Sequence, residues 1–263
     1  MDLKLAGKRA LVSGASRGLG YATAKGLAQE GVRVAINSRD LDAITAAGQK
    51  LAGETGAQVL PLAGDVSDPS VPEKVVSEAA NTLGGLDLLV TNSGGPPAGL
   101  FESFDDETWQ KAIDLALLSH VRLIRAALPH LRQSPAASVL TITSYSVKQP
   151  IPNLVLSNSV RAATVGLTKT LALELGNDGI RFNSILPAWT ETERVVELME
   201  HRAKVNETTL EQEMTRQAAD SPLGRMGKPE EMANAAVFLL SPAACYITGV
   251  MLTVDGGMYK GTL

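Results

Sequence analysis

The amino-acid sequence predicts an α/β fold built on a doubly wound parallel sheet of about seven strands, with helices on both faces. Three observations carry this prediction. Short runs rich in Val, Ile and Leu alternate along the chain with longer segments of helical periodicity. Each short run is almost continuously apolar, which is typical of strands that are buried on both faces. No linker, composition shift or internal repeat divides the chain, so we expect a single domain over residues 1–263.

The alternation assigns each element in order. Strands are expected at residues 9–14, 32–37, 57–62, 86–92, 138–143, 180–186 and 250–254. Helices are expected near residues 18–30, 40–54, 69–83, 106–133, 155–176 and 229–240. Strands that alternate with helices at this spacing favour a parallel sheet covered by its own connections.

Residues 190–226 break the alternation. No strand is expected between Trp189 and Gly227, but the segment holds two amphipathic stretches, TERVVELMEHR and LEQEMTRQAADS. An insertion after the sixth strand overhangs the carboxyl edge of the sheet, where ligands bind in open α/β folds. We interpret it as a helical substrate lid; a surface helical hairpin without a gating role is the alternative.

Composition narrows the class of protein. The net charge of −4 gives no electrostatic footprint for nucleic acid. No stretch approaches the ~20 apolar residues of a membrane span, and the first residues do not read as a secretory signal. We therefore expect a cytoplasmic protein that acts on a small molecule and binds neither nucleic acid nor membrane.

The cysteine and the histidines suggest no metal site. Cys245 stands alone in an apolar neighbourhood, so we expect a small core residue. His120, His130 and His201 are too few and too scattered to form a metal cluster, and no role is assigned to them.

A glycine-rich loop follows the first expected strand. Residues 13–20 read SGASRGLG and open the first expected helix. Glycine lets the backbone approach a pyrophosphate, whose charge the helix N-terminus favours. The loop therefore predicts a dinucleotide site, with a plain tight turn as the alternative.

The end of the second strand indicates which dinucleotide binds. An NAD site places an Asp or Glu there, on the ribose 2′-hydroxyl. Here the strand ends VAINSRD, with Arg39 after Ser38, and Arg17 lies in the glycine loop. Arginines bind a 2′-phosphate bidentately, so NADP(H) is favoured over NAD. Two alternatives stay open: Asp40 could pair with Arg39, and either arginine could be a solvated surface charge.

These motifs resemble the short-chain dehydrogenase/reductase family from about residue 5 to residue 257. SGASRGLG is similar to the family's TGxxxGxG, and TNSG at 91–94 stands where the family has NNAG. PLGRMGKPEEMANAAVFLLS and YITGVMLTVDGG resemble the 3-oxoacyl-acyl-carrier-protein reductase branch. The resemblance implies a Rossmann-type fold with these cofactor-binding residues: Gly14, Ser16, Arg17, Gly18, Leu19, Gly20, Arg39, Asp65, Val66, Asn92, Gly94, Pro187 and Thr192.

The catalytic positions depart from the family pattern. The family works with an Asn, a Ser, a Tyr and a Lys, and Ser144 matches the serine. Ser157 stands in the tyrosine position, Arg161 in the lysine position and Ala116 in the asparagine position. Ser157 is a weak acid that lacks the reach of a phenol. Arg161 keeps a permanent charge and a donor fork that could hold the ribose or polarise a substrate oxygen.

Tyr145 is the other candidate proton donor. Its phenol could turn toward the substrate if the fifth strand has ended, but it points away from Ser144 if the chain is still extended. The candidate catalytic residues are therefore Ser144, Ser157, Arg161 and Tyr145.

The resemblance implies an NADP(H)-dependent oxidoreductase of carbonyl or alcohol substrates, 3-oxoacyl reductase-like, with a non-standard active site. An acyl-like substrate is one expectation. The first alternative is an NADP(H)-binding protein with little or no redox turnover, and the second is a structural subunit whose glycine loop is a relic. The family's four-helix interface implies a homotetramer, built from the helices at 106–133 and 155–176.

Overall fold

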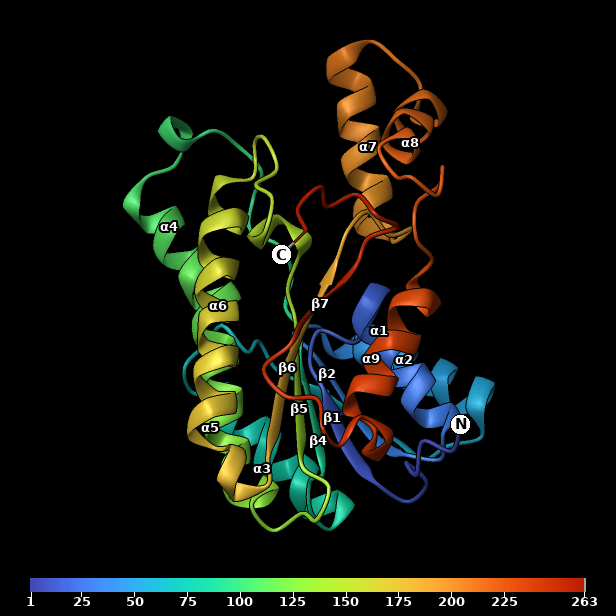
Figure 1. Ribbon diagram of the computed structural model, residues 1–263, viewed down its shortest axis with the longest axis vertical. Helices are drawn as coiled ribbons and strands as arrows, with labels where there is room; N and C mark the ends of the chain where they lie inside the picture. Colours follow the sequence, from blue (N-terminus) through green and yellow to red (C-terminus); the bar gives the residue numbers. More distant parts are fainter. Residues whose placement is uncertain (263) are drawn as a thin grey trace.

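The computed structural model describes residues 1–262, apart from the side chain of His201 (Figure 1). Its seven strands form one parallel sheet in the order β3-β2-β1-β4-β5-β6-β7. The strands are β1 (Arg9–Val12), β2 (Arg33–Ser38), β3 (Val59–Ala63), β4 (Leu88–Thr91), β5 (Ser138–Ile142), β6 (Arg181–Pro187) and β7 (Met251–Val254). The predicted doubly wound sheet is confirmed.

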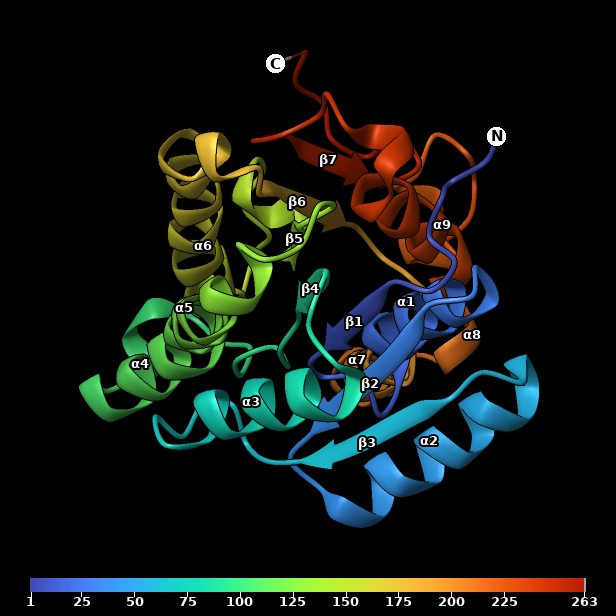
Figure 2. The same cartoon turned by 90° about the horizontal axis from the view of Figure 1, so that it is seen from below.

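Helices cover both faces of the sheet (Figures 1 and 2). One face carries α1 (Gly18–Gln29), α2 (Leu41–Thr55) and α9 (Pro229–Leu240), and the other carries α3 (Val71–Leu83), α5 (Ser119–Leu131) and α6 (Val155–Glu174). Strand β1 shows why its sequence is apolar throughout. Ala10 and Val12 belong to the core beneath α1 and α9, whereas Leu11 belongs to the core beneath α3 and α5. Alternate residues of a strand point to opposite faces, so both sets must be apolar.

The long helix expected at 106–133 runs without a break from Asp106 to Leu131, but it contains a π-helical turn that the sequence did not predict. The segment forms α4 (Asp106–Ile113), a π-helical turn (Asp114–Leu118) and then α5. The Ser119 N–H donates to the Asp114 carbonyl five residues back, which widens the turn. The Ala116 carbonyl in this turn accepts a hydrogen bond of 2.6 Å from the Thr164 hydroxyl of α6. This contact comes from another helix, so the periodicity of the segment did not reveal the π-helical turn.

The segment after β6 forms a helical hairpin. Helices α7 (Glu193–Asn206) and α8 (Leu210–Ala219) pack against each other and project beyond the carboxyl ends of the strands (Figure 1). Thr192 caps α7 by accepting a hydrogen bond from the Val195 N–H, and a capping box at Thr209 begins α8. None of the helices among the described residues combines the length and apolar character that crossing a bilayer requires.

The expectation that Cys245 is a core residue is wrong. Its side chain is exposed, just after a 3₁₀ turn at Pro242–Ala244. The preceding residue, Ala244, takes the core position and is 1% exposed, so the turn directs Cys245 outward.

A buried ion pair joins the amino ends of β1 and β4. Asp87 is 2% exposed and accepts hydrogen bonds from the Arg9 Nε and Nη2 at 2.8 Å and from the Ser134 hydroxyl at 2.6 Å. Burial alone would raise the pKa of Asp87, but the hydrogen bonds from Arg9 and Ser134 outweigh burial and lower that pKa. The carboxylate thus stabilises the fold only while it is charged.

We expect Asp87→Asn to lower the free energy of unfolding by about 3 kcal/mol, because it leaves the Arg9 charge unpaired. Asp178→Ala is the matched control. It removes the exposed ion pair between Asp178 and Arg132 and should cost less than about 1 kcal/mol. The Asp87 contribution is present above the ordinary Asp pKa of about 4 and is lost as pH falls through the lowered folded-state pKa. Urea unfolding of both variants at neutral and acidic pH measures this; equal losses would contradict the prediction.

Candidate active site

The predicted site residues gather where the strands end. The cofactor residues follow β1 (Gly14, Ser16, Arg17, Gly18, Leu19, Gly20), β2 (Arg39), β3 (Asp65, Val66) and β4 (Asn92, Gly94), or lie at and after the end of β6 (Pro187, Thr192). Ser144 follows β5, and Ser157 and Arg161 lie in the first two turns of α6. Parallel strands place all their carboxyl ends at one edge of the sheet, so residues far apart in sequence meet there.

Hydrogen bonds hold the glycine loop against the end of β4. The Ser13 hydroxyl donates to the Asn92 carbonyl at 2.8 Å, and the Asn92 side chain donates to the Gly14 carbonyl at 3.0 Å. Gly14 has φ +59°, in the left-handed region that favours glycine. A Cβ at Gly20 would collide with the Gly14 carbonyl, so the turn cannot accommodate a side chain there.

The N-terminus of α1 is open to an anion. Arg17, the residue before the helix, is extended, and no described side chain caps the first turn. The N–H groups of this turn therefore lack a side-chain acceptor. A Cβ at Gly18 would lie 3.6 Å from Thr192 Cγ2, so Thr192 lies beside the loop. Gly18 and Thr192 also line a cleft of about 640 Å³ between α1 and α7, but glutamates dominate its other charged lining, so the fit to an anion rests on the glycine loop and the uncapped first turn. The loop therefore fits a pyrophosphate.

Strand β2 contains no carboxylate. Asp40 accepts a hydrogen bond of 2.8 Å from the Ala43 N–H, and so it caps α2. Arg39 is exposed. The other predicted arginine, Arg17, forms an exposed ion pair of 3.0 Å with Glu197 of α7. After β3, Asp65 accepts hydrogen bonds from the backbone and hydroxyl of Ser67.

Arg161 connects three elements at the end of β5. Its Nε donates to the Ser157 hydroxyl at 3.2 Å, and its Nη2 donates to the Gly94 carbonyl at 3.3 Å. Its Nη1 lies 3.5 Å from the carbonyls of Ile142 and Thr143, the two residues before Ser144. The structure thus brings together Ser157, Arg161, Gly94 and the two residues that precede Ser144. Arg161 is 7% exposed, and burial lowers the pKa of its guanidinium to about 10.

Ser144 and Tyr145 point in different directions. The backbone at Ser144 is extended (φ −163°, ψ 150°), and its hydroxyl accepts a hydrogen bond of 3.1 Å from the Ser146 N–H. Tyr145 is buried. Burial raises its pKa, a hydrogen bond with Trp189 opposes the rise, and Asp220 and Asp255 add to it. These partners belong to the base of the helical hairpin and to the chain after β7, so Tyr145 lies against the hairpin.

One buried polar pair below the site was not anticipated from the sequence. His120 lies one helical turn after Ala116, and its Nδ1 is 2.7 Å from the Thr91 hydroxyl. Its Nε2 is buried without a partner among the described residues. Burial, with the nearby charge of Arg161, lowers the pKa of His120 to about 3, so the ring is neutral. Thr91 ends β4 and His120 lies in α5, so no local pattern in the sequence indicated this pair.

No role is predicted for the other two histidines. His130 is partly exposed on α5, and the side chain of His201 lies outside the described residues. Among the residues that are described, no three His, Cys, Asp or Glu side chains are grouped to hold a metal ion.

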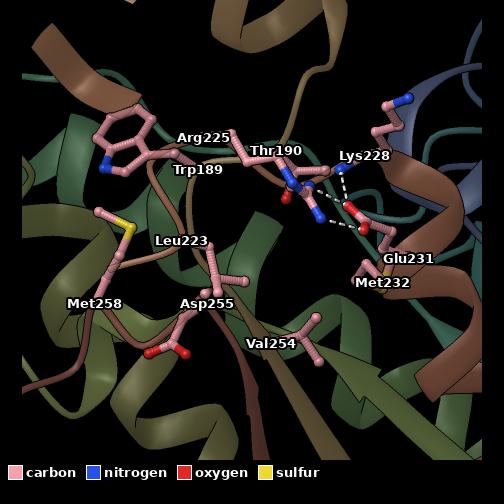
Figure 3. Close-up of a pocket in the computed structure, with 12 residues that line it drawn as sticks. Trp189, Thr190, Leu223, Arg225, Lys228, Glu231, Met232, Val254, Asp255 and Met258 are labelled. Atoms are coloured by element: carbon pink, nitrogen blue, oxygen red, sulfur yellow. Dashed lines mark hydrogen bonds and ion pairs between the residues drawn. The ribbon is translucent and has the colours of Figure 1, made fainter. Parts of the chain in front are cut away.

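A smaller cavity lies beside Tyr145, whose partners Trp189 and Asp255 both line it. It encloses about 120 Å³ between the end of β7 and the start of α9 (Figure 3). Arg225 and Glu231 face each other on one side in a two-point ion pair of 2.7 and 2.6 Å. Trp189 forms the opposite side, and its ring also stacks against the Arg202 guanidinium at 5.1 Å. None of the predicted site residues lines this cavity.

Comparison with known proteins gives the family. Residues 14–259 match the family model described as Enoyl-(Acyl carrier protein) reductase. The chain is 33% identical over 258 residues to the L-rhamnose 1-dehydrogenase (NAD(P)(+)) of Sphingomonas sp. (strain SKA58), covering 97% of each. It is 31% identical over 259 residues to a 3-oxoacyl-(acyl-carrier-protein) reductase of Thermotoga maritima, covering 97% of this chain and 99% of that one.

Solved structures agree with this result. The L-sorbose reductase of Gluconobacter frateurii, complexed with NADPH and L-sorbose, is 33% identical, with a TM-score of 0.95 over 99% of this chain and 100% of the other. An NADPH-bound short chain oxidoreductase of Pseudomonas aeruginosa PAO1, described as containing an atypical catalytic center, is 31% identical. Its TM-score is 0.88, over 97% of this chain and 98% of the other. The chain therefore belongs to the short-chain dehydrogenase/reductase family.

Proposed function

We propose that the protein is an NADP(H)-dependent oxidoreductase of carbonyl and alcohol substrates with a non-standard active site. The reaction in the reducing direction converts a carbonyl compound, NADPH and one proton to an alcohol and NADP⁺. The observation that carries the proposal is the meeting of the glycine loop, Ser144 and the buried Arg161 at one edge of the sheet. The relatives named for L-sorbose reduction and L-rhamnose oxidation act on carbonyl and alcohol groups, which supports it.

The residues of the first two strand ends fit NADP(H). The loop at Gly14 and Gly18 and the uncapped first turn of α1 would hold the pyrophosphate. Arg17 and Arg39 would bind the 2′-phosphate, because Asp40 is occupied as the cap of α2. The cofactor, when bound, supplies the hydride that reduces the carbonyl carbon. Both solved relatives contain NADPH, which also favours this cofactor over NAD.

Each candidate catalytic side chain would act on the substrate oxygen in a different way. The Ser144 hydroxyl would donate a hydrogen bond to that oxygen and orient it. The guanidinium of Arg161 would stabilise the negative charge that develops there, and its burial strengthens this effect. The Ser157 hydroxyl accepts from Arg161 Nε, so its own O–H is free to donate toward the oxygen. The proton taken up by the oxygen would then come from solvent through this hydroxyl.

The hairpin of α7 and α8, within residues 190–226, would act as a substrate lid on a single domain. It begins at Thr192 beside the glycine loop, and its Glu197 pairs with Arg17 of that loop. The outward face of α6 would pack in a homotetramer, since it exposes Ala162, Ala163 and Gly166, and Leu173 is 73% exposed.

The second candidate function is NADP(H) binding without turnover. It is favoured by the loss of a phenol at Ser157 and of an amide at Ala116. Calorimetry that shows NADPH binding, with no oxidation of NADPH by any ketose, oxo acid or ketone tested, would establish it in place of the enzyme.

We expect Arg17→Gln and Arg39→Gln each to weaken NADPH binding by about tenfold and to leave NADH binding nearly unchanged, because only NADPH carries the 2′-phosphate. Arg33→Gln is the control, since Arg33 is an exposed arginine at the opposite end of β2. Fluorescence titration with both nucleotides measures the change. Equal weakening for NADH and NADPH would contradict the assignment.

We expect Ser144→Ala to lower kcat/KM by about 10²-fold or more, because it removes a donor to the reacting oxygen. Tyr145→Phe should retain most of the activity, because the Tyr145 hydroxyl faces the base of the hairpin. Steady-state oxidation of NADPH with the best carbonyl substrate measures both variants. A loss in Tyr145→Phe as large as that in Ser144→Ala would identify Tyr145 as the proton donor instead.

A further inference from the structure

Arg161 is a buried cation whose charge no carboxylate of the described chain neutralises. All four of its hydrogen bonds are long, between 3.2 and 3.5 Å, and all go to neutral oxygens. Burying a charge without an anionic partner is costly, and hydrogen bonds to an ionised group are ordinarily shorter than these. These bonds engage four of the five N–H groups, but none of them neutralises the charge, so the guanidinium still attracts an anion.

Other buried or partly buried arginines have a carboxylate partner or short hydrogen bonds to backbone carbonyls. Arg9 pairs with Asp87 at 2.8 Å, and Arg122 pairs with Asp114 at 2.9 Å. Arg181 has no such partner, but its guanidinium donates to carbonyls at the end of α9 at 2.6 to 3.0 Å, where the helix dipole favours a cation. Arg161 has neither a carboxylate nor a helix end, so it differs from all three.

The groups around Arg161 are also kept neutral. His120, whose pKa the Arg161 charge helps to lower, carries no charge at neutral pH. His120 Nε2 and the Ser146 hydroxyl are buried polar atoms without partners among the described residues, and the Ser146 N–H donates to the Ser144 hydroxyl. An anion bound at Arg161 would meet a positive charge that no carboxylate of the described residues neutralises.

We propose that Arg161 binds a carboxylate of the substrate, so that the preferred substrates are small oxo acids and the corresponding hydroxy acids. This rests on the proposed function, since it names the substrate class of the same site. The Ser157 hydroxyl lies 3.2 Å from Arg161 Nε. A ligand whose carbonyl oxygen accepts a hydrogen bond from Ser157 would bring its carboxylate nearest to Arg161 Nε when the two groups are on neighbouring carbons. Reduction would add hydride to the carbonyl carbon and a proton to its oxygen, leaving the carboxylate unchanged.

The first experiment compares acid and ester in the unaltered protein. Pyruvate and its methyl ester are tested as substrates with NADPH. Oxamate and ethyl oxamate, which are not reduced, are titrated calorimetrically into the NADPH complex. We expect each acid to be favoured over its ester by at least about tenfold, in kcat/KM or in Kd. Equal values for acid and ester would overturn the proposal, and no variant has to fold for this comparison.

The second experiment assigns the preference to Arg161. Arg161→Gln should abolish the preference of oxamate over ethyl oxamate, and Arg161→Lys should retain part of it, since it keeps the charge but not the fork. Arg125→Gln, which removes an exposed charge from α5, should leave the preference unchanged. An intact preference in a folded, NADPH-binding Arg161→Gln would overturn the assignment.

The outcomes separate this inference from the proposed function. Reduction of neutral ketones or sugars with no preference for the charged acids would leave the oxidoreductase proposal standing and overturn the carboxylate site. Binding of oxamate that depends on Arg161, without reduction of any carbonyl compound, would support the carboxylate site and overturn the proposed turnover.

Discussion

The hydrogen bonds among Ser13, Gly14 and Asn92 are the constraint on which the site depends. They join the end of β1 to the end of β4, the two neighbouring strands from which the sheet is wound in opposite directions. At such a switch point the connections leave toward opposite faces and a crevice opens between them. Because Asn92 supplies both a backbone and a side-chain contact, the glycine loop and the loop after β4 form one rigid unit. Gly94, which accepts from Arg161, extends that unit to α6.

The second organising feature is the pair of Ser157 and Arg161, which the family resemblance places where a tyrosine and a lysine are expected. A lysine–tyrosine pair combines a cation with an acid that can donate a proton. Ser157 and Arg161 retain the cation, one helical turn from a hydroxyl, but they contain no group that titrates near neutral pH. Under the proposed function, chemistry at this site would depend on electrostatic stabilisation and on solvent as the source of protons. The buried position of Arg161 suits that task, since a charge acts more strongly where water is excluded.

The layer below the site accommodates this buried cation. The π-helical turn presents the Ala116 carbonyl to Thr164, and His120 pairs with Thr91 one helical turn later. Thr141 likewise bonds the hydroxyls of Thr168 and Ser184. These groups are neutral, so none of them offers Arg161 a counter-charge, and His120 Nε2 is left without a partner among the described residues. The charge of Arg161 therefore remains without a carboxylate partner among the described residues, as the proposed carboxylate site requires.

The sequence by itself determined the architecture, because that information is local and periodic. All seven strands lie within about two residues of their predicted positions, and the glycine loop stands between β1 and α1 as expected. Motif spacing also predicted which residues stand at the end of β5 and at the start of α6, namely Ser144, Ser157 and Arg161. Long-range contacts decided the rest. A hydrogen bond from Thr164 accompanies the π-helical turn within the helix at 106–133, and Ala244 takes the core position expected for Cys245.

Only the tertiary structure could show that Arg161 lacks a carboxylate partner and that His120 lies beneath it. Both facts depend on side chains from several elements that meet at one edge of the sheet. No periodicity within one segment encodes such a meeting, because it arises from how the segments pack.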